Sequence, residues 1–367
     1  MNMDTDIESF PLYDIEGDAH QCGQQYGRAA GDRIDLSLRT YRLAFERVGL
    51  DWERTRALAR RFIPVIEAFD AAMLREIEGL AAGAGVPTED IVALNARSEM
   101  LYAFAQLEAS EPPDGCTGVV VMPSAARDGK LIHAQNWDWR VESLELGVVL
   151  RIQPAKGPAM LTFAEAGTLA RAGLNSHGIA VTGNFIRADG DGTRQGVPLA
   201  LIRRGILQSE LYADALGVVC RTARSISNNM IVTHAEGEAV SLETCPDQVF
   251  WQQPEAGLLV HANHFKTSAA LARVVDRSLE TTPDSLYRDR RVTEALRART
   301  GDLTEQDVLD ALQDRFGAPR AVCRSPSAGP GGASSATVAT IVMDPAARKM
   351  RIAPAPFKAH RFTEYSL

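Results

Sequence analysis

The feature that most constrains the fold is a change in hydrophobic periodicity between residues 112 and 116. Before it, apolar residues recur every three or four positions, as in Ile34, Leu38, Tyr41 and Phe45, which predicts amphipathic helices. After it, short β-rich runs alternate with turn signals. Because helical and strand segments are separated along the chain, we expect an α+β fold of antiparallel sheets covered by helices.

A second helical stripe before the change combines six apolar residues that step by three and four and therefore predict one helix face. These residues are Phe62, Ile66, Phe69, Met73, Ile77 and Leu80. The Gly-Ala-Gly-Val-Pro stretch at 83–87 is expected to end this helix. Thr88 is expected to cap the next one.

The second part of the chain contains three hairpin signals, Asp128-Gly129, Glu236-Gly237 and Asp344-Pro345, each between two β-rich runs. Further strands are predicted over 147–152, 178–181, 230–233 and 257–260. Helices are expected to return near 196–226 and 284–316, the latter with a capping box at Thr304 to Asp307. Residues 325–335, rich in Ser, Gly and Pro, are predicted to be a loop.

Composition excludes several classes of protein. The net charge is −8 and the pI is about 5.5, which argues against a nucleic-acid surface or a polybasic membrane anchor. Five sparse cysteines argue against a disulfide scaffold. No apolar run approaches the roughly 20 residues that span a bilayer, and the first residues are acidic, unlike a signal peptide. We therefore expect a cytoplasmic protein with no membrane or nucleic-acid partner.

Phosphate loops and metal sites find little support. The glycines at 190–196 lack dinucleotide-fingerprint spacing, and the Gly-Pro-Gly-Gly stretch at 329–332 has a proline where backbone donors would be needed. His261 and His264 are three residues apart after a predicted strand, which would direct them to opposite faces. We expect no metal, although a metal hydrolase using these two histidines remains an alternative.

Cys116 lies in the stretch Pro-Pro-Asp-Gly-Cys-Thr-Gly at 112–118, at the point where the periodicity changes. Such a loop is turn-prone and easily cut. A cut before Cys116 would create an N-terminal cysteine whose α-amine has a pKa of about 7.7–8.0 and can act as the base for its own thiol. The alternative is that Cys116 is simply a small buried apolar residue.

The stretch Ala-Gln-Asn-Trp-Asp-Trp at 134–139 follows a predicted strand. Alternation places Asn136 and Asp138 on one face and Trp137 and Trp139 on the other. On periodicity alone, this is also compatible with an ordinary amphipathic strand end.

Asp-Gly-Cys-Thr followed by Gln-Asn-Trp-Asp-Trp resembles the acyl-coenzyme A:6-aminopenicillanic acid acyltransferase family of self-processing cysteine peptidases. These are N-terminal nucleophile hydrolases related to choloylglycine hydrolases. The resemblance extends to Gly23-Gln-Gln-Tyr-Gly27 before a helix, to the stretch at 173–184, to His-Ala-Asn-His-Phe at 261–265 and to the final strand pair. It implies a four-layer αββα sandwich with a helical N-terminal segment.

The resemblance assigns roles residue by residue. Cys116 matches the nucleophile, with cleavage between Gly115 and Cys116, and Asp138 matches the aspartate that orients the α-amine. Asn263 matches a side chain that helps bind the oxyanion, and Asn184 matches a source of a backbone donor. An active-site arginine is expected at Arg288, with Arg291 as the alternative.

Other expectations are less closely tied to a matching position. Asn136, Trp137, Phe185 and Phe265 are expected to contact substrate. The separation of Cys116 and Asp138 is a few residues longer than in the family pattern, and the hairpin through Pro123 to Gly129 can accommodate the difference.

The predicted function is a self-cleaving N-terminal cysteine amidohydrolase or acyltransferase acting on a small N-acyl amide or an acyl-coenzyme A. No cofactor is expected, although a coenzyme A thioester could be the substrate. Residues 1–115 would remain bound to 116–367 as a second chain sharing one core, because their apolar stripes would otherwise be exposed. A higher oligomer is possible. The alternative is an unprocessed, non-catalytic binding protein on the same fold.

Overall fold

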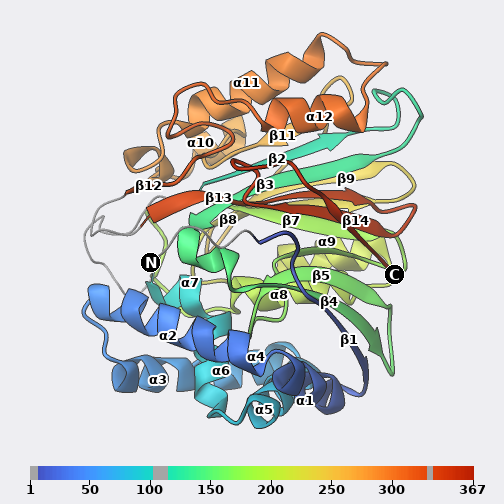
Figure 1. Cartoon of the computed structure of the whole chain (residues 1–367). Helices are drawn as coiled ribbons and strands as arrows, with labels where there is room; N and C mark the ends of the chain where they lie inside the picture. Colours follow the sequence, from blue (N-terminus) through green and yellow to red (C-terminus); the bar gives the residue numbers. More distant parts are fainter. Residues whose placement is uncertain (1–6, 102–114, 329–333) are drawn as a thin grey trace.

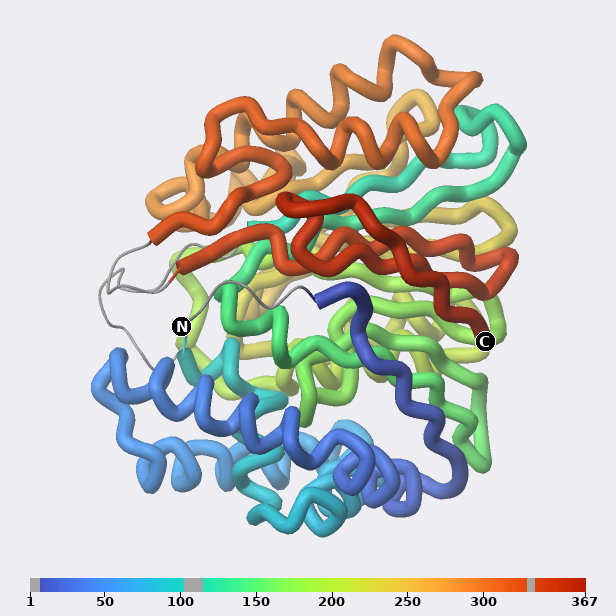
Figure 2. The backbone as a smooth tube through the Cα atoms, viewed as in Figure 1, coloured from blue at the N-terminus to red at the C-terminus, as the bar shows by residue number. Residues whose placement is uncertain are grey.

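The chain folds into four layers, two β-sheets packed face to face with helices covering both outer faces (Figure 1). The structure is a computed structural model that describes residues 7–101, 115–328 and 334–367. The early helices lie on one side, the late helices lie on the other, and the strands lie between them (Figure 2). The expected α+β class and αββα layering are therefore confirmed.

Sheet A has eight strands in the order β1-β4-β5-β6-β7-β8-β9-β10. Its strands are β1 (Leu12–Gly17), β4 (Gly147–Pro154), β5 (Met160–Glu165), β6 (Ala172–Asn175), β7 (Ile179–Phe185), β8 (Asn228–His234), β9 (Glu238–Thr244) and β10 (Val249–Gln252). All neighbours are antiparallel except β1 and β4, which pair in parallel with Leu12 opposite Val149.

Sheet B has seven strands in the order β11-β2-β3-β13-β14-β15, with β12 paired to β13. Its strands are β2 (Gly115–Val121), β3 (Ile132–Arg140), β11 (Leu258–His261), β12 (Ser327–Ala328), β13 (Ser334–Asp344), β14 (Lys349–Pro354) and β15 (Thr363–Ser366). The three predicted hairpins are confirmed as β2–β3, β8–β9 and β13–β14.

The helices fall into two groups. Against sheet A lie α1 (Ala19–Ala29), α2 (Gly31–Arg47), α3 (Trp52–Arg60), α4 (Ile63–Phe69), α5 (Ala71–Ala84), α6 (Thr88–Asn95), α7 (Arg97–Glu99), α8 (Leu199–Leu207) and α9 (Tyr212–Arg221). On the sheet B side lie α10 (Ser268–Leu271), α11 (Ser285–Arg297) and α12 (Glu305–Leu312), and two 3₁₀ turns cover Val141–Leu144 and Ser278–Glu280.

Among the described residues, three large hydrophobic clusters lie at the three interfaces between these layers, and two smaller clusters accompany them. The first joins the early helices to sheet A, and the third joins sheet B to α11 and α12. The second lies between the sheets and contains Cys116, Trp137, Trp139 and Phe163. Strand alternation explains this arrangement, because each strand sends one set of side chains to the partner sheet and the other to the helices.

Several local predictions were wrong in detail. The stripe from Phe62 to Leu80 is two helices rather than one, because Asp70 leaves the helical conformation and its side chain accepts from Ala72 N and Met73 N to cap α5. Thr88 is the first residue of α6 and not its cap.

Two further segments differ from the prediction. The Gly23 to Gly27 stretch precedes helix α2, as expected, but it also lies inside α1, a helix that was not predicted. Part of the predicted 325–335 loop forms β12, which pairs with the start of β13. The Gly-Pro-Gly-Gly residues lie outside the described ranges, as do Pro112, Pro113 and Asp114 of the predicted cleavage loop.

Helices α1 and α5 approach so closely that glycines are needed at their crossing. A Cβ added at Gly79 would lie 2.2 Å from His20 O, and one at Gly23 would lie 1.9 Å from Glu76 O. Gly79→Ala is therefore expected to lower the free energy of unfolding by about 1–3 kcal/mol through overpacking. Gly31→Ala in α2 is the matched control, because its Cβ meets nothing within 4 Å. Thermal unfolding of both variants tests this, and equal stability would contradict it.

The helical N-terminal segment is bound to the rest of the molecule by buried polar contacts. Tyr41 donates to Glu165 Oε1 at 2.6 Å, and Arg97 forms a buried ion pair with the other carboxylate oxygen. Arg204 of α8 pairs with Glu76 of α5 at 2.7 Å, again buried. Removing either segment would leave these groups unpaired, which is costly in an apolar environment.

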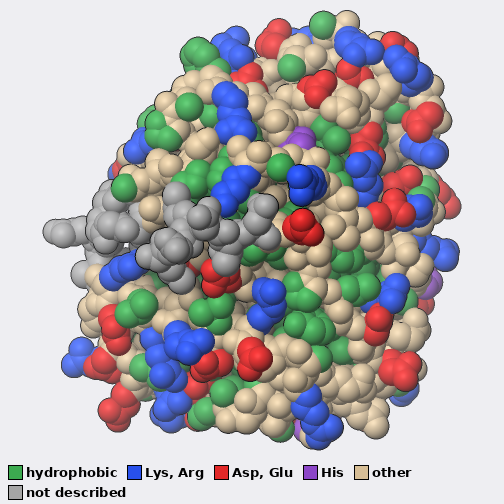
Figure 3. All heavy atoms as spheres, in the orientation of Figure 1, with side chains coloured by type: hydrophobic (Ala, Val, Ile, Leu, Met, Phe, Trp, Pro, Cys, Tyr) green, Lys and Arg blue, Asp and Glu red, His purple; other side chains and the backbone are tan. Residues whose placement is uncertain are grey.

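The surface carries mixed charges. In Figure 3, the side chains of Lys and Arg are interspersed with those of Asp and Glu over the visible face. In the described part of the chain, no helix is both long and apolar enough to cross a lipid bilayer.

Candidate active site

Cys116 is the second residue of β2, and its side chain lies between the two sheets. It is paired across the strands with Trp137 of β3, so the two side chains share a face. Arg171 donates from Nη2 to Cys116 Sγ at 3.3 Å, and its guanidinium stacks on the Trp137 ring at 4.3 Å from the centroid. Cys116 and Trp137 are both buried.

The backbone of Cys116 is held on both sides of its Cα. Its N–H donates to Asn263 Oδ1 at 2.8 Å, and its carbonyl accepts from Arg288 Nη1 at 2.8 Å. Arg288 also donates to Asn263 Oδ1 at 2.8 Å. Asn263 Nδ2 donates to Phe185 O at 2.7 Å, which leaves its second amide hydrogen for another acceptor.

A buried series of alternating charges leads away from this backbone. Arg288 pairs with Asp284 at 2.8 Å, Asp284 pairs with Arg324, and Arg324 lies 3.0 Å from Asp138. Thr337 adds a hydrogen bond to Asp138 of 2.6 Å. Burial raises the pKa of Asp138, while Arg324 and Arg288 oppose the rise. The series contains two carboxylates and two guanidinium groups, so its positive and negative charges balance.

Gly115, the residue before Cys116, is packed against this series of charges. Gly115 is paired with Asp138, and a Cβ at Gly115 would lie 2.5 Å from Asp138 Oδ2 and 2.6 Å from Arg324 Cζ. Only a glycine fits here without displacing those groups. Asp138 consequently lies beside the residue that would leave if the Gly115–Cys116 bond were cut.

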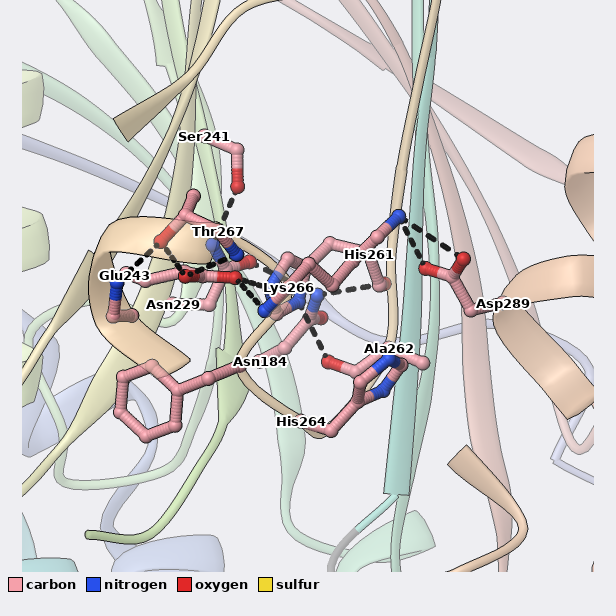
Figure 4. Close-up of polar contacts among 12 residues, drawn as sticks. Asn184, Asn229, Ser241, Glu243, His261, Ala262, His264, Lys266, Thr267 and Asp289 are labelled. Carbon is pink, nitrogen blue, oxygen red and sulfur yellow. Dashed lines mark hydrogen bonds and ion pairs between the residues drawn. The ribbon is translucent and has the colours of Figure 1, made fainter. Parts of the chain in front are cut away.

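The loop that carries Asn263 is held by a buried carboxylate, drawn in Figure 4. Glu243 of β9 accepts from His261 Nε2 at 2.9 Å, from Lys266 N at 2.6 Å and from Thr267 Oγ1 at 2.8 Å. Burial alone would raise the pKa of Glu243. The hydrogen bond and charge of His261 help to outweigh that effect, and the pKa is lowered. Glu243 thus fixes both ends of the 262–265 loop.

Asn184 lies at the end of β7, with its side chain in a separate network beside this loop (Figure 4). Its Nδ2 donates to His261 O at 2.9 Å and to Asn229 Oδ1 at 3.2 Å, and its Oδ1 accepts from Gln135 at 2.6 Å. The side chain is therefore occupied by these contacts.

Of the remaining residues expected to contact substrate, Phe185 lies at the site, whereas Asn136 and Phe265 lie away from Cys116. Phe185 is half-buried and contributes the carbonyl that holds Asn263. Asn136 lies on the helix-facing side of β3, where it bonds Leu312 O, Val322 O and Thr340. Phe265 packs in a separate cluster. The structure does not bring Asn136 or Phe265 to Cys116.

The two arginines that the sequence left open lie in different environments. Arg288 is fully buried beside Cys116, whereas Arg291 is partly exposed, pairs with Asp314 at 2.6 Å and stacks on Phe316. Of the two, Arg288 is the one that contacts the backbone of Cys116.

His261 and His264 do not point to opposite faces, contrary to the strand argument. β11 ends at His261, and the two rings stack with centroids 6.4 Å apart. In residues 7–101, 115–328 and 334–367, no group of three His, Cys, Asp or Glu side chains is arranged to hold a metal ion.

Sequence reasoning missed Arg171, Asp284, Arg324 and Thr337. Arg171 directly precedes β6 and the 173–184 stretch, which was a signal available in the sequence. Arg324 lies next to a Ser- and Gly-rich segment that reads only as a loop. Asp284 precedes α11 and Thr337 lies within a β-rich run, so tertiary packing alone reveals them.

This arrangement can support nucleophilic acyl transfer. A thiol lies beside a cation, its backbone nitrogen and carbonyl are fixed, and an asparagine amide lies next to it. A nearby cation favours the reactive thiolate, and a pre-positioned amide donor can stabilise an oxyanion.

Comparisons with known proteins agree on the type of protein. A family model described as acyl-coenzyme A:6-aminopenicillanic acid acyl-transferase matches residues 125–358, a range that starts after Cys116. The 40 kDa form of acyl-coenzyme A:6-aminopenicillanic-acid-acyltransferase from Emericella nidulans is 29% identical over 279 residues, covering 76% of this chain and 73% of that protein.

The chain is also similar to solved structures. A mutant of conjugated bile acid hydrolase from Clostridium perfringens has a TM-score of 0.47 and 11% identity, with 69% of this chain and 92% of that chain covered. The Caenorhabditis elegans ortholog of N-acylethanolamine-hydrolyzing acid amidase has a TM-score of 0.45 and 16% identity, with 69% and 100% covered.

Proposed function

The chain belongs to the acyl-coenzyme A:6-aminopenicillanic acid acyl-transferase family, and within it we propose a self-cleaving cysteine amidohydrolase or acyltransferase that works through an S-acyl-Cys116 intermediate. The observation that carries this proposal is the position of Cys116. It directly follows a tightly packed glycine, and its own nitrogen and carbonyl are held by Asn263 and Arg288.

Cleavage would begin with attack of the Cys116 sulfur on the Gly115 carbonyl carbon. The C–N bond breaks, the Cys116 nitrogen takes up a proton, and a thioester links Gly115 to Sγ. Water then hydrolyses the thioester, giving the Gly115 carboxylate and a free thiol. Asp138 and Arg324, which lie against Gly115, would then adjoin the new α-amine and orient it.

Turnover would reuse the same groups. The α-amine accepts the thiol proton, Sγ attacks the substrate carbonyl, and the Asn263 amide stabilises the oxyanion. The bond to the leaving group then breaks, C–N in an amide or C–S in a thioester, and the released amine or coenzyme A thiol takes the proton, which completes acylation of Cys116. Water as the second acceptor gives hydrolysis, and an amine gives acyl transfer. The small substrate is an N-acyl amide or an acyl-coenzyme A thioester, and these steps require no cofactor.

We further propose that residues 1–115 remain bound after cleavage and that the two chains share one core in the cytoplasm. The parallel pairing of β1 with β4 and the Tyr41–Glu165 and Glu76–Arg204 contacts support the retention of residues 1–115. Under denaturing conditions, mass spectrometry is expected to detect two fragments, the smaller ending at Gly115. In native size-exclusion chromatography the fragments should elute together, and an N-acyl substrate should leave a trapped adduct on Cys116.

Each alternative predicts a different result. A chain that stays intact and never carries an adduct would be an unprocessed binding protein on this fold. Activity that survives loss of the Cys116 thiol but disappears on chelation would indicate a metal hydrolase using His261 and His264.

A further inference from the structure

Among the residues that the structure describes, two buried guanidinium groups near Cys116 form no ion pair with a carboxylate. Arg171 and Arg203 are 6% and 7% exposed, and in the part of the chain that the structure describes neither forms an ion pair. Among the described residues, their hydrogen bonds and ring contact are with groups other than carboxylates. Arg171 meets Cys116 Sγ and the Trp137 ring, and Arg203 donates to Asn228 Oδ1 at 3.2 Å. Within the described residues, the Nε atom of each is buried without a hydrogen-bond partner.

This contrasts with the arginines on the other side of the nucleophile. Arg288 and Arg324 are balanced by Asp284 and Asp138. An uncompensated buried cation is costly, so a pair of them is the mark of a site built to receive an anion.

Arg203 lies close enough to interact with Arg171. It comes from α8 and packs on β7 at Gly183, where an added Cβ would meet its Nε and Nη2 at 2.7 Å. Burial, followed by the charges of Arg171 and Arg97, lowers the pKa of Arg203 to about 9. The nearby Glu99 carboxylate compensates these positive charges only in part. Burial raises its pKa to about 7, and its Oε1 already accepts a hydrogen bond from Leu199 N at 2.7 Å.

We propose that Arg171 and Arg203 form a subsite for a carboxylate that the substrate carries within a few bonds of its reacting carbonyl. The contact between Arg171 and Sγ sets this limit, because the anion must lie next to the atom that is acylated. A carboxylate on the amine portion, as in an N-acyl amino acid, is two atoms from the amide nitrogen. The phosphates of coenzyme A are separated from its thioester by the whole pantetheine arm and are too far away.

This inference rests on the proposed function for its substrate, so its first test uses the thiol alone. Cys116 is alkylated with iodoacetate, which carries a carboxylate, or with neutral iodoacetamide, and both rates are followed by peptide mass spectrometry. Sγ displaces iodide in each case. Because both reagents use the same thiolate, any effect of Arg171 on the pKa of the thiol cancels in the ratio of the two rates. The exposed Cys220 in the same molecule provides the reference ratio.

The iodoacetate-to-iodoacetamide ratio at Cys116 is expected to exceed that at Cys220 by at least tenfold, as charge-assisted hydrogen bonds to a carboxylate require. Arg171→Met and Arg203→Met should each bring it down severalfold toward the Cys220 value. Arg75→Met, at an exposed position on α5, is the control and should not change it. A ratio that is unchanged in both variants would overturn the proposal.

The second test identifies the source of the carboxylate. Turnover of an N-acyl alanine is compared with that of the matching N-acyl alaninamide, and turnover of a succinic acid mono-amide with that of its neutral ester. In one of these two pairs, Arg171→Met and Arg203→Met should reduce the preference for the carboxylate-bearing substrate at least tenfold. An effect in the alanine pair places the carboxylate on the amine portion, and an effect in the succinic acid pair places it on the acyl portion. If neither pair is hydrolysed while the alkylation ratio responds to the variants, the proposed amidase function fails and the anion subsite stands.

Discussion

Replacing Cys116 by alanine is expected to leave a single chain of 39.8 kDa and to abolish amide turnover. The side chain is fully buried and small, so Cys116→Ala removes the sulfur with little change in packing. Without the sulfur neither the Gly115 thioester nor the S-acyl intermediate can form. The rate should therefore fall by roughly 10⁴-fold or more, as when a covalent nucleophile is removed. Denaturing mass spectrometry and an amide-hydrolysis assay measure the two effects.

Cys22→Ala is the matched control, because Cys22 is also a buried thiol but lies in α1, far along the chain from the site. It should be processed and active like the parent chain. Processing or turnover that persists in Cys116→Ala would place the nucleophile elsewhere.

Turn residues and hydrophobic periodicity predicted most of the fold, whereas long-range strand pairing and one local side-chain cap were not predicted. The turn at Asp128-Gly129 predicted the β2–β3 hairpin because the required backbone conformation, with Gly129 at φ +69°, is a property of neighbouring residues. β1 carried no comparable signal, since its partner β4 follows more than a hundred residues later. Asp70 interrupts a regular apolar stripe through its capping bonds, which periodicity does not detect.

The site shows the same division. Cys116, Asp138, Asn263 and Arg288 lie in recognisable stretches, and the structure places all four around the Gly115–Cys116 bond. Their roles stay predictions until they are tested. Asn136 lies on the same face of β3 as Asp138, as strand alternation requires. That face packs against Leu312 of α12 and Val322, whereas the Cys116 thiol lies on the opposite side of the sheet. Periodicity predicts which side chains share one face of a strand, but it does not predict whether helices or the other sheet pack against that face.

Arg324 illustrates why the rest could not be predicted. It follows a cysteine and precedes a Ser- and Pro-rich run, so nothing local distinguishes it from a solvated arginine. Its importance comes from burial between Asp138 and Asp284, which are distant from it in sequence. The stability of such a series of charges depends on every member being paired.

Arg288→Met is expected to have the second-largest effect because it removes four hydrogen bonds at once. The guanidinium contacts Cys116 O, Thr117, Asn263 and Asp284 and is fully buried. Breaking this buried pair should lower the free energy of unfolding by about 3–5 kcal/mol. Cys116 and the Asn263 amide would lose their alignment, so kcat/KM should fall about 10²–10³-fold if they act as proposed.

Arg291→Met is the matched control one helical turn away. Its ion pair with Asp314 is partly exposed, and the loss should be at most about 1 kcal/mol. Arg288→Lys separates folding from function, because a lysine keeps the charge beside Asp284 but cannot reach Cys116 O and Asn263 together. It should regain much of the stability of the parent chain while kcat/KM stays low. Chemical unfolding and steady-state kinetics of the three variants decide the matter. If Arg291→Met loses as much activity as Arg288→Met, or if Arg288→Lys restores full activity, the geometric role of Arg288 is wrong.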